Sequence, residues 1–160
     1  MSPDARILVI DDDPLFRSLL AASLDRHTVE TAADGSEGYY MAIAAVPDVM
    51  ILDLQMSGWD GLKTLTMLRG NPLTASVPVI MLTSDGTRAQ IVEAVRLGAS
   101  DYVLKPGFSI DELVAKVEKY LAARVPAAAV NTATVSADSP AELVSSDVPT
   151  ADFVDDDNWE

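Results

Sequence analysis

Residues 7–14 read Ile7-Leu8-Val9-Ile10-Asp11-Asp12-Asp13-Pro14, an apolar run that ends in three aspartates and a proline. A run of about four apolar residues that ends at a polar one is typical of a strand buried in a parallel sheet. The pattern returns three times along the chain, and the later runs end at Asp53, Thr83 and Lys105. These four stretches predict strands of one parallel sheet.

Strand and helix patterns alternate over the first 124 residues. We expect strands over residues 7–10, 28–32, 49–53, 77–82 and 101–104. We expect helices over residues 35–45, 62–69 and 88–97, with a further helix that begins at Pro14 and another that follows a Ser109–Glu112 capping box. Five such units predict an α/β fold, a doubly wound five-stranded parallel sheet flanked by five helices.

The apolar spacing also predicts the inward faces of these helices. For the helix that begins at Pro14, the inward residues are Leu15, Phe16, Leu19 and Leu20, and for the helix over residues 88–97 they are Ile91, Ala94 and Val95.

The charge divides the chain into two parts. Residues 1–124 hold 17 acidic and 11 basic residues, whereas residues 125–160 hold 8 acidic and no basic ones. The second part has three prolines and no regular apolar period. We therefore expect one domain over residues 1–124 and an acidic, disordered tail over residues 125–160.

Several classes of protein are excluded by composition. There is no cysteine, so disulfides and thiolate chemistry are excluded. Neither part has a basic stripe, so we expect no direct binding to nucleic acid. No apolar run approaches a membrane span, and we expect a cytoplasmic protein without membrane insertion. The single histidine, His27, lies in a short polar stretch, and we expect it to be exposed and without a metal or acid–base role.

The polar residues that end the strands predict one site, because ligands bind outside the carboxyl ends of strands in open α/β sheets. Three carboxylates that meet there repel one another, so at least one pKa should be raised. A hard cation relieves this repulsion, and we expect Mg²⁺ with Asp12 and Asp53 as direct ligands, Asp11 acting through water, and the backbone carbonyl of Gln55.

The same site suits phosphoryl transfer. Asp53 would be the nucleophile, since a carboxylate can form an acyl phosphate when a metal screens the incoming charge. Lys105 would balance the phosphoryl oxygens, and Thr83 would donate a hydrogen bond to one of them. Taken singly, each residue has an ordinary structural explanation, and Asp13 is expected to cap the helix that follows it.

Residues 6–121 resemble the receiver domain of two-component response regulators. The resemblance rests on residues 7–14, 47–54, 78–83 and 101–106 and on Asp60-Gly61. It implies a flavodoxin-like fold with sheet order 2-1-3-4-5. It also implies that Asp53 accepts a phosphoryl group from a histidine kinase or a phosphotransfer protein and loses it by slow self-catalysed hydrolysis. We therefore expect a signalling switch and not an enzyme.

The resemblance further implies how the switch works. Thr83 would move toward the phosphoryl group, and Tyr102 would turn inward. The surface of the fourth helix, the fifth strand and the fifth helix would then engage a downstream protein that the sequence does not name. Gln55 and Asp85 occupy the positions that tune phosphoryl lifetime, and homodimerisation on activation is left open.

Two departures from the family pattern concern loops. Met56 is followed by Ser57-Gly58 where the family usually has proline, and Gly107 follows Lys105-Pro106 where a bulky apolar residue is common. Neither departure touches a reacting group, so we expect a competent phosphoacceptor.

Alternatives stay open at this point. One is a phosphorylation-independent scaffold, and another is a hydrolase of the haloacid dehalogenase kind, although Gln55 stands where that class has its general acid. The simplest interpretation is a stand-alone receiver. Its tail would be a solvating segment, a short linear motif anchored by Trp159, or a cover for the switch surface that uses its acids against Arg88, Arg96, Lys116 or Lys119.

Overall fold

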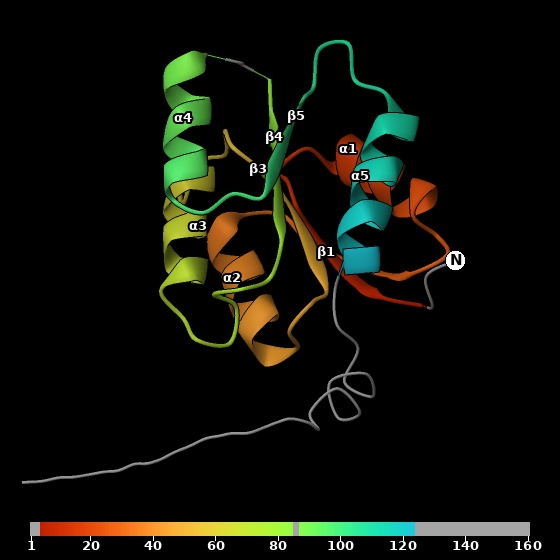
Figure 1. The fold of residues 1–160 in the computed structure, drawn as a ribbon, viewed down its shortest axis with the longest axis horizontal. Helices are drawn as coiled ribbons and strands as arrows, with labels where there is room; N and C mark the ends of the chain where they lie inside the picture. The colour runs from red at the N-terminus through yellow and green to blue at the C-terminus, as the bar shows by residue number, and fades with distance from the viewer. Residues whose placement is uncertain (1–3, 85–86, 124–160) are drawn as a thin grey trace, which may run out of the picture. The chain divides into compact units, whose positions relative to one another are not determined.

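Five parallel strands lie side by side in the computed structural model in the order β2-β1-β3-β4-β5 (Figure 1). They are β1 (Arg6–Ile10), β2 (Thr28–Ala32), β3 (Val49–Asp53), β4 (Val79–Thr83) and β5 (Asp101–Leu104). The structure describes residues 4–84 and 87–123, which belong to the compact unit Met1–Ala123. The order confirms the predicted doubly wound, flavodoxin-like sheet. The predictions for Asp85, for residues 125–160 and for Trp159 concern residues outside this description.

Both faces of the central strands β1, β3 and β4 are buried, because their residues alternate between two cores. In β1, Ile7 and Val9 belong to one core, and Leu8 and Ile10 belong to the other. All five residues of β3 and of β4 are buried. Continuous apolar runs are therefore required in the central strands, which is the pattern that predicted them.

The helices form two layers. They are α1 (Pro14–Ser23), α2 (Gly35–Ala44), α3 (Gly61–Arg69), α4 (Arg88–Arg96) and α5 (Ile110–Ala123). The first core holds Leu20 of α1 and Leu113, Val117 and Leu121 of α5, and the second holds residues of α2, α3 and α4. Figure 1 accordingly shows α1 and α5 on one side of the sheet and α2, α3 and α4 on the other.

Aspartate side chains begin three of these helices. Asp13 accepts hydrogen bonds from Leu15 N at 2.9 Å and Phe16 N at 3.4 Å, as predicted for a helix cap. Asp34 and Asp60 do the same for α2 and α3. At α5, Ser109 Oγ accepts from Glu112 N at 3.2 Å, which is one half of the expected capping box.

The predicted inward faces of α1 and α4 were wrong in part. Leu15 and Leu19 are 80% and 42% exposed, and Val95 is 56% exposed. In α1 the side chains that pack toward the sheet are Phe16 and Leu20, which lie four residues apart on one face of the helix. Leu15 and Leu19 each come one residue earlier, so the helix turns them about a quarter of a circle away from the sheet. A helix that contacts the sheet along one line buries a narrow face, so fewer of its apolar side chains are buried than their number in the sequence suggests.

His27 is buried, which corrects the expectation that it is exposed. Its side chain is 1% exposed. Nδ1 accepts a hydrogen bond from Ala5 N at 3.2 Å, and Nε2 lies 2.8 Å from Glu118 Oε2 on α5. Because Nδ1 accepts, Nε2 carries the proton and donates to Glu118. The polar residues around His27 gave no sign of these two contacts, because the partners Ala5 and Glu118 lie 22 and 91 residues away in sequence.

Arg69 at the end of α3 joins the loop before β4 to the loop before β5. Its guanidinium donates to Gly98 O, Thr74 O and Val77 O at 2.7–3.1 Å. Because the Val77 carbonyl is used in this way, β4 begins at Val79 and not at the predicted residue 77. Gly98 has φ +106°, and a Cβ there would lie 2.8 Å from Arg69 Nε, so glycine is required.

Within residues 4–84 and 87–123, no helix has both the length and the apolar character needed to cross a bilayer.

Candidate functional site

The polar residues that end four strands meet at one edge of the sheet. Asp11 follows β1, Asp53 ends β3, Thr83 ends β4 and Lys105 follows β5. The parallel register sets Asp53 opposite Leu82 and Thr83 opposite Leu104. The edge is therefore built from segments that lie up to 94 residues apart, as the strand pattern predicted.

Lys105 lies between two carboxylates. Its Nζ is 3.0 Å from Asp11 Oδ2 and 3.4 Å from Asp53 Oδ2. The two aspartates are buried, with side chains 0% and 3% exposed, while Lys105 keeps 19% of its side chain exposed. The electrostatic attraction between two charges shielded from water in this way is much stronger than that between two charges on the surface.

An aromatic ring supports this lysine, a contact that the sequence pattern did not predict. Nζ lies 4.6 Å from the centroid of the Phe16 ring, and Phe16 packs against Phe108 with ring centroids 5.2 Å apart. A ring face attracts a cation and excludes water from it. The available signal was Phe108, which stands three residues after Lys105 and takes the place of the apolar residue expected at Gly107.

The backbone of the first acidic segment is held firmly. Asp11 Oδ1 accepts from Asp13 N at 2.9 Å, and Arg17 Nη1 donates to Asp11 O at 2.7 Å. These bonds turn the second oxygen of Asp11, Oδ2, toward Lys105 and Asp53. Arg17 is a second contributor that the sequence pattern did not identify.

Asp11, Asp12 and Asp53 form a cluster in which one carboxylate oxygen of each lies within 4.8 Å of the others. Asp11 and Asp53 are buried, and Asp12 is exposed at the mouth of the cluster. Asp11 Oδ2 is buried and forms an ion pair with Lys105, but the angle between them is not that of a hydrogen bond. This oxygen therefore has no hydrogen-bond donor among the described residues. A hard divalent cation that keeps bound water needs several carboxylate oxygens and an open side, and the three carboxylates of this cluster provide both.

The cluster perturbs the titration of its members. Burial, with the nearby charge of Asp11, raises the pKa of Asp53 from 3.8 to about 6, although Lys105 opposes the shift. This confirms that one carboxylate pKa is raised. Burial by itself would lower the pKa of Lys105, but the close contact with Asp11 and the charge of Asp53 outweigh burial and raise it.

The loop after β3 approaches the site closely. Gln55 N donates to Asp53 Oδ1 at 3.3 Å, and Ser84 Oγ donates to Gln55 Oε1. The second bond joins the loop after β3 to the segment after β4. At the start of α3, a Cβ on Gly61 would lie 2.5 Å from Asp53 O, so only glycine permits this approach. Thr83 is buried at the same edge.

The loop after β3 and α4 enclose a cavity of about 370 Å³. Its lining consists of Asp12, Leu54, Gln55, Met56, Ser57, Asp60, Leu62 and Gln90. Leu54 and Gln55 directly follow Asp53, so the cavity adjoins the acidic cluster. Gln90, which sequence reasoning did not single out, supplies the wall on the α4 side.

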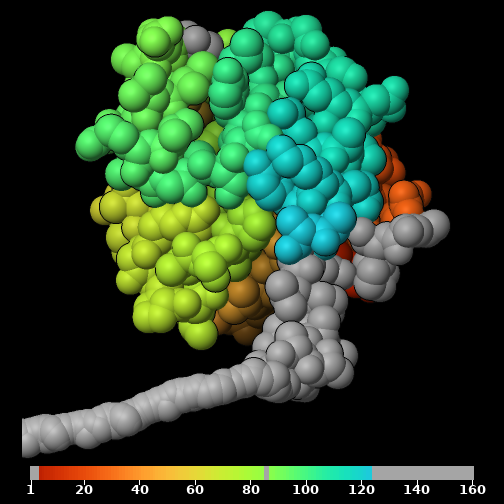
Figure 2. Space-filling view, in the orientation of Figure 1, coloured from red at the N-terminus to blue at the C-terminus, as the bar shows by residue number. Residues whose placement is uncertain are grey.

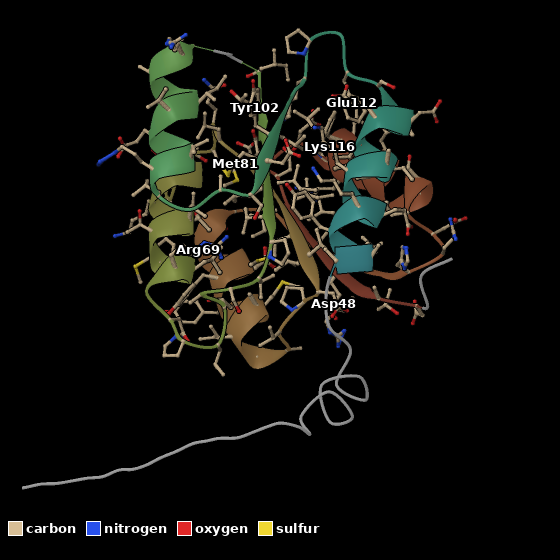
Figure 3. All side chains as sticks on the ribbon, in the orientation of Figure 1. Asp48, Arg69, Met81, Tyr102, Glu112 and Lys116 are labelled. Atoms are coloured by element: carbon tan, nitrogen blue, oxygen red, sulfur yellow. The ribbon has the colours of Figure 1, made fainter. Side chains whose placement is uncertain are left out.

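Tyr102 lies on the surface formed by β5 and its neighbouring helices. The side chain is 41% exposed. Figure 2 shows α4 in green and α5 in blue on one face, and Figure 3 shows Tyr102 on β5 beside Glu112 and Lys116 of α5. These three residues line a shallow cavity of about 420 Å³. Lys116 Nζ is 3.1 Å from Asp101 Oδ1, which steadies the junction between β5 and α5.

Comparison with known proteins agrees with this geometry. The model of the response regulator receiver domain matches residues 7–118. The DNA-binding dual master transcriptional regulator RpaA of Synechocystis sp. (strain ATCC 27184 / PCC 6803 / Kazusa) is 38% identical over 128 residues, which cover 78% of this chain and 53% of that protein. The DNA-binding response regulator MtrA of Mycolicibacterium smegmatis is 36% identical over 143 residues, which cover 87% of this chain and 61% of that protein.

Solved structures give the same result. Chemotaxis protein CheY4 of Vibrio cholerae has a TM-score of 0.69 and 28% identity, with 73% of this chain and 98% of that chain covered. The receiver domain of Francisella response regulator 1452 has a TM-score of 0.69 and 29% identity, with 75% and 98% covered. The chain spans about half the length of several curated relatives that it matches. It belongs to the family of response regulator receiver domains of two-component systems.

Proposed function

We propose that Asp53 accepts a phosphoryl group from the phosphohistidine of a histidine kinase or a phosphotransfer protein. The observation that carries this proposal is the position of Lys105 Nζ, 3.4 Å from Asp53 Oδ2 inside a buried acidic cluster. A carboxylate nucleophile and a cation for the incoming phosphoryl oxygens then stand together at the edge of the sheet. The domain would act as a switch and not as an enzyme with a separate substrate.

The carboxylates of the cluster suit Mg²⁺. Asp12 and Asp53 would be direct ligands with the backbone carbonyl of Gln55, and Asp11 would hold a bound water through the oxygen that lacks a hydrogen-bond donor. When bound, the ion would screen the negative charge of the donor from that of the carboxylates.

The residues of the chain carry the transfer itself. One Asp53 oxygen forms a bond to phosphorus while the phosphorus–nitrogen bond breaks, and its electron pair returns to the imidazole. With a pKa of about 6, Asp53 is largely ionised at neutral pH and able to attack. Lys105 and the Thr83 hydroxyl would stabilise the phosphoryl oxygens. Gln55, with Asp85, would set the rate at which water later removes the group.

The phosphorylated site would be read out on the surface of α4, β5 and α5. A phosphoryl group would draw Thr83 toward it, and Tyr102 would turn from its exposed position into the space that opens. We propose that this surface then binds a protein partner or a second copy of the chain. RpaA and MtrA are DNA-binding proteins, but residues 1–124 hold 17 acidic and 11 basic residues, which favours a protein partner for this domain.

Intact mass spectrometry tests the proposal. The full chain is incubated with Mg²⁺ and acetyl phosphate or phosphoramidate, beside an Asp53→Asn variant and a control, Asp25→Asn, at an exposed aspartate outside the site. We expect one base-labile phosphoryl group on the wild type and the control, and none on Asp53→Asn. Failure of all three to gain mass would favour the scaffold. Steady turnover of an added phosphomonoester would favour the hydrolase.

A further inference from the structure

The amide oxygen of Gln90 has no hydrogen-bond donor among the residues that the structure describes. Gln90 lies in the first turn of α4, and its Oε1 is shielded from solvent. Within residues 4–84 and 87–123, Asp11 Oδ2 is the other side-chain atom of this kind, and it has the Lys105 ammonium at 3.0 Å. An unpaired buried acceptor costs about 1–3 kcal/mol, and such groups are rare without a reason.

The position of Gln90 relates this oxygen to the proposed reaction. Gln90 lines the cavity of about 370 Å³ that adjoins Asp53, together with Gln55 and Met56 of the loop after β3. This volume is many times the ~30 Å³ that one water occupies in the liquid. The terminal amide torsion of glutamine is broad, so rotation about one bond turns Oε1 toward the cavity. A phosphodonor that reaches Asp53 from this side would place its leaving group against Gln90.

The lining of the cavity favours a leaving group that donates hydrogen bonds. Gln90 contributes an acceptor that no described residue uses, while the carboxylate of Asp12 is taken up by the proposed Mg²⁺. Asp60 Oδ1 already accepts from Lys63 N, and Gln55 Oε1 already accepts from Ser84 Oγ. Gln90 Oε1 is thus a spare acceptor next to the acidic cluster. The leaving group of a phosphorus–nitrogen donor carries an N–H that suits this acceptor, on the departing nitrogen of phosphoramidate or on the second ring nitrogen of phosphohistidine, whereas the carboxylate that leaves an acyl phosphate can only accept.

We propose that Gln90 Oε1 accepts an N–H from the leaving group of a phosphorus–nitrogen donor and so makes the domain prefer such donors to acyl phosphates. This inference rests on the proposed function of Asp53. One Asp53 oxygen forms the new bond to phosphorus, the phosphorus–nitrogen bond breaks, and its electron pair stays on nitrogen. Phosphoramidate, protonated on nitrogen, releases ammonia, and phosphohistidine, protonated on its second ring nitrogen, releases neutral imidazole. No further reactant is needed.

The test compares two small donors on the full chain with Mg²⁺. Initial phosphorylation rates with phosphoramidate and with acetyl phosphate are measured by intact mass, and their ratio is the readout. Gln90→Met keeps the length of the side chain but removes the amide, and Gln90→Leu is a second variant without an acceptor. Gln90→Glu keeps an acceptor, and Ala89→Met adds a methionine at the exposed neighbouring position. Thermal unfolding of each variant shows that it is folded.

We expect Gln90→Met and Gln90→Leu to slow phosphorylation by phosphoramidate about 5- to 10-fold, the effect of one lost hydrogen bond, with acetyl phosphate changed less than about 2-fold. Gln90→Glu should slow both anionic donors through its added negative charge but keep the wild-type ratio of the two rates, and Ala89→Met should leave both rates near those of the wild type. For Gln90→Met and Gln90→Leu, equal losses with both donors, or an unchanged ratio, would overturn the proposal. So would a Gln90→Glu variant whose donor ratio falls as far as that of Gln90→Met, because the amide would then act as a donor.

The experiment distinguishes a failure of the role of Gln90 from a failure of the proposed function of Asp53. If acetyl phosphate labels the wild type and Gln90→Met leaves the donor ratio unchanged, only the role of Gln90 is wrong. If neither donor labels the wild type, the proposed function of Asp53 fails, and the role of Gln90 fails with it.

Discussion

Lys105 and Asp53, which lie 52 residues apart in the chain, approach within 3.4 Å at the carboxyl edge of the sheet. The ammonium is also 3.0 Å from Asp11 and 4.6 Å from the centre of the Phe16 ring. Two carboxylates and an aromatic face therefore hold this lysine where an incoming phosphoryl group would meet the nucleophile.

Removal of Lys105 should slow phosphorylation. In Lys105→Met the phosphoryl oxygens lose a cation, and Asp53 loses the charge that limits its pKa. We expect the rate with acetyl phosphate to fall at least about 10-fold, because one buried charge–charge contact is worth more than ~1.4 kcal/mol. Lys119→Met, at an exposed lysine of α5, is the matched control and should keep the wild-type rate. Equal rates in the two variants would contradict this role for Lys105.

Asp53 should titrate at an unusually high pH in the absence of divalent cations. The carboxyl ¹³C signal of Asp53, followed by NMR with chelator present, should give a pKa of about 6. Added Mg²⁺ should lower this pKa, since a bound cation favours the ionised form. Asp101 provides an internal comparison, because the hydrogen bonds from Tyr102 and Lys116 outweigh burial and lower its pKa. A pKa of Asp53 near 3.8 without metal would show that neither burial nor the charge of Asp11 raises it.

The same shift predicts that the functional carboxylate reduces stability. Asp53 has a pKa of about 6 in the folded chain, against 3.8 as its ordinary value, so the folded state binds the proton more tightly. Its contribution to the free energy of unfolding therefore falls as pH rises from about 4 to about 6 and stays low above that.

Asp53→Asn should remove this penalty. At pH 7.5 without metal we expect the variant to be about 1–2 kcal/mol more stable than the wild type, with the difference shrinking toward pH 4. Urea unfolding at several pH values, each with chelator, measures the difference. A variant less stable than the wild type at pH 7.5 would mean that the ion pair with Lys105 outweighs burial and repulsion.

The contact between His27 and Glu118 should contribute to stability. His27→Ala would leave the Ala5 N–H without its acceptor and remove the contact between Nε2 and Glu118, and we expect a loss of about 2–3 kcal/mol in urea unfolding. Arg26→Ala, which removes an exposed side chain 4.0 Å from the same carboxylate, should cost less than about 0.5 kcal/mol. Similar losses in both variants would mean that the His27 contact is no stronger than a surface pair.

Much of the fold is local in origin and could be predicted. The runs at Ile7–Ile10 and Val49–Leu52 are apolar throughout because both faces of these strands are covered. The aspartates that begin α1, α2 and α3 act within three residues of their own position. The meeting of Asp11, Asp53 and Lys105 followed from the same pattern, since parallel strands bring their carboxyl ends to one edge.

What the sequence determined by itself is thus the set of strands, the helix starts and the polar residues at the carboxyl edge, because each depends on neighbours within a few residues. The tertiary structure alone decided that His27 is buried against Glu118, that Leu15 and Leu19 face outward, that Phe16 supports Lys105 and that Gln90 lines the cavity beside Asp53. These outcomes depend on which elements pack together. Local periodicity carries no information about a partner that lies tens of residues away and reaches its place only when the sheet has formed.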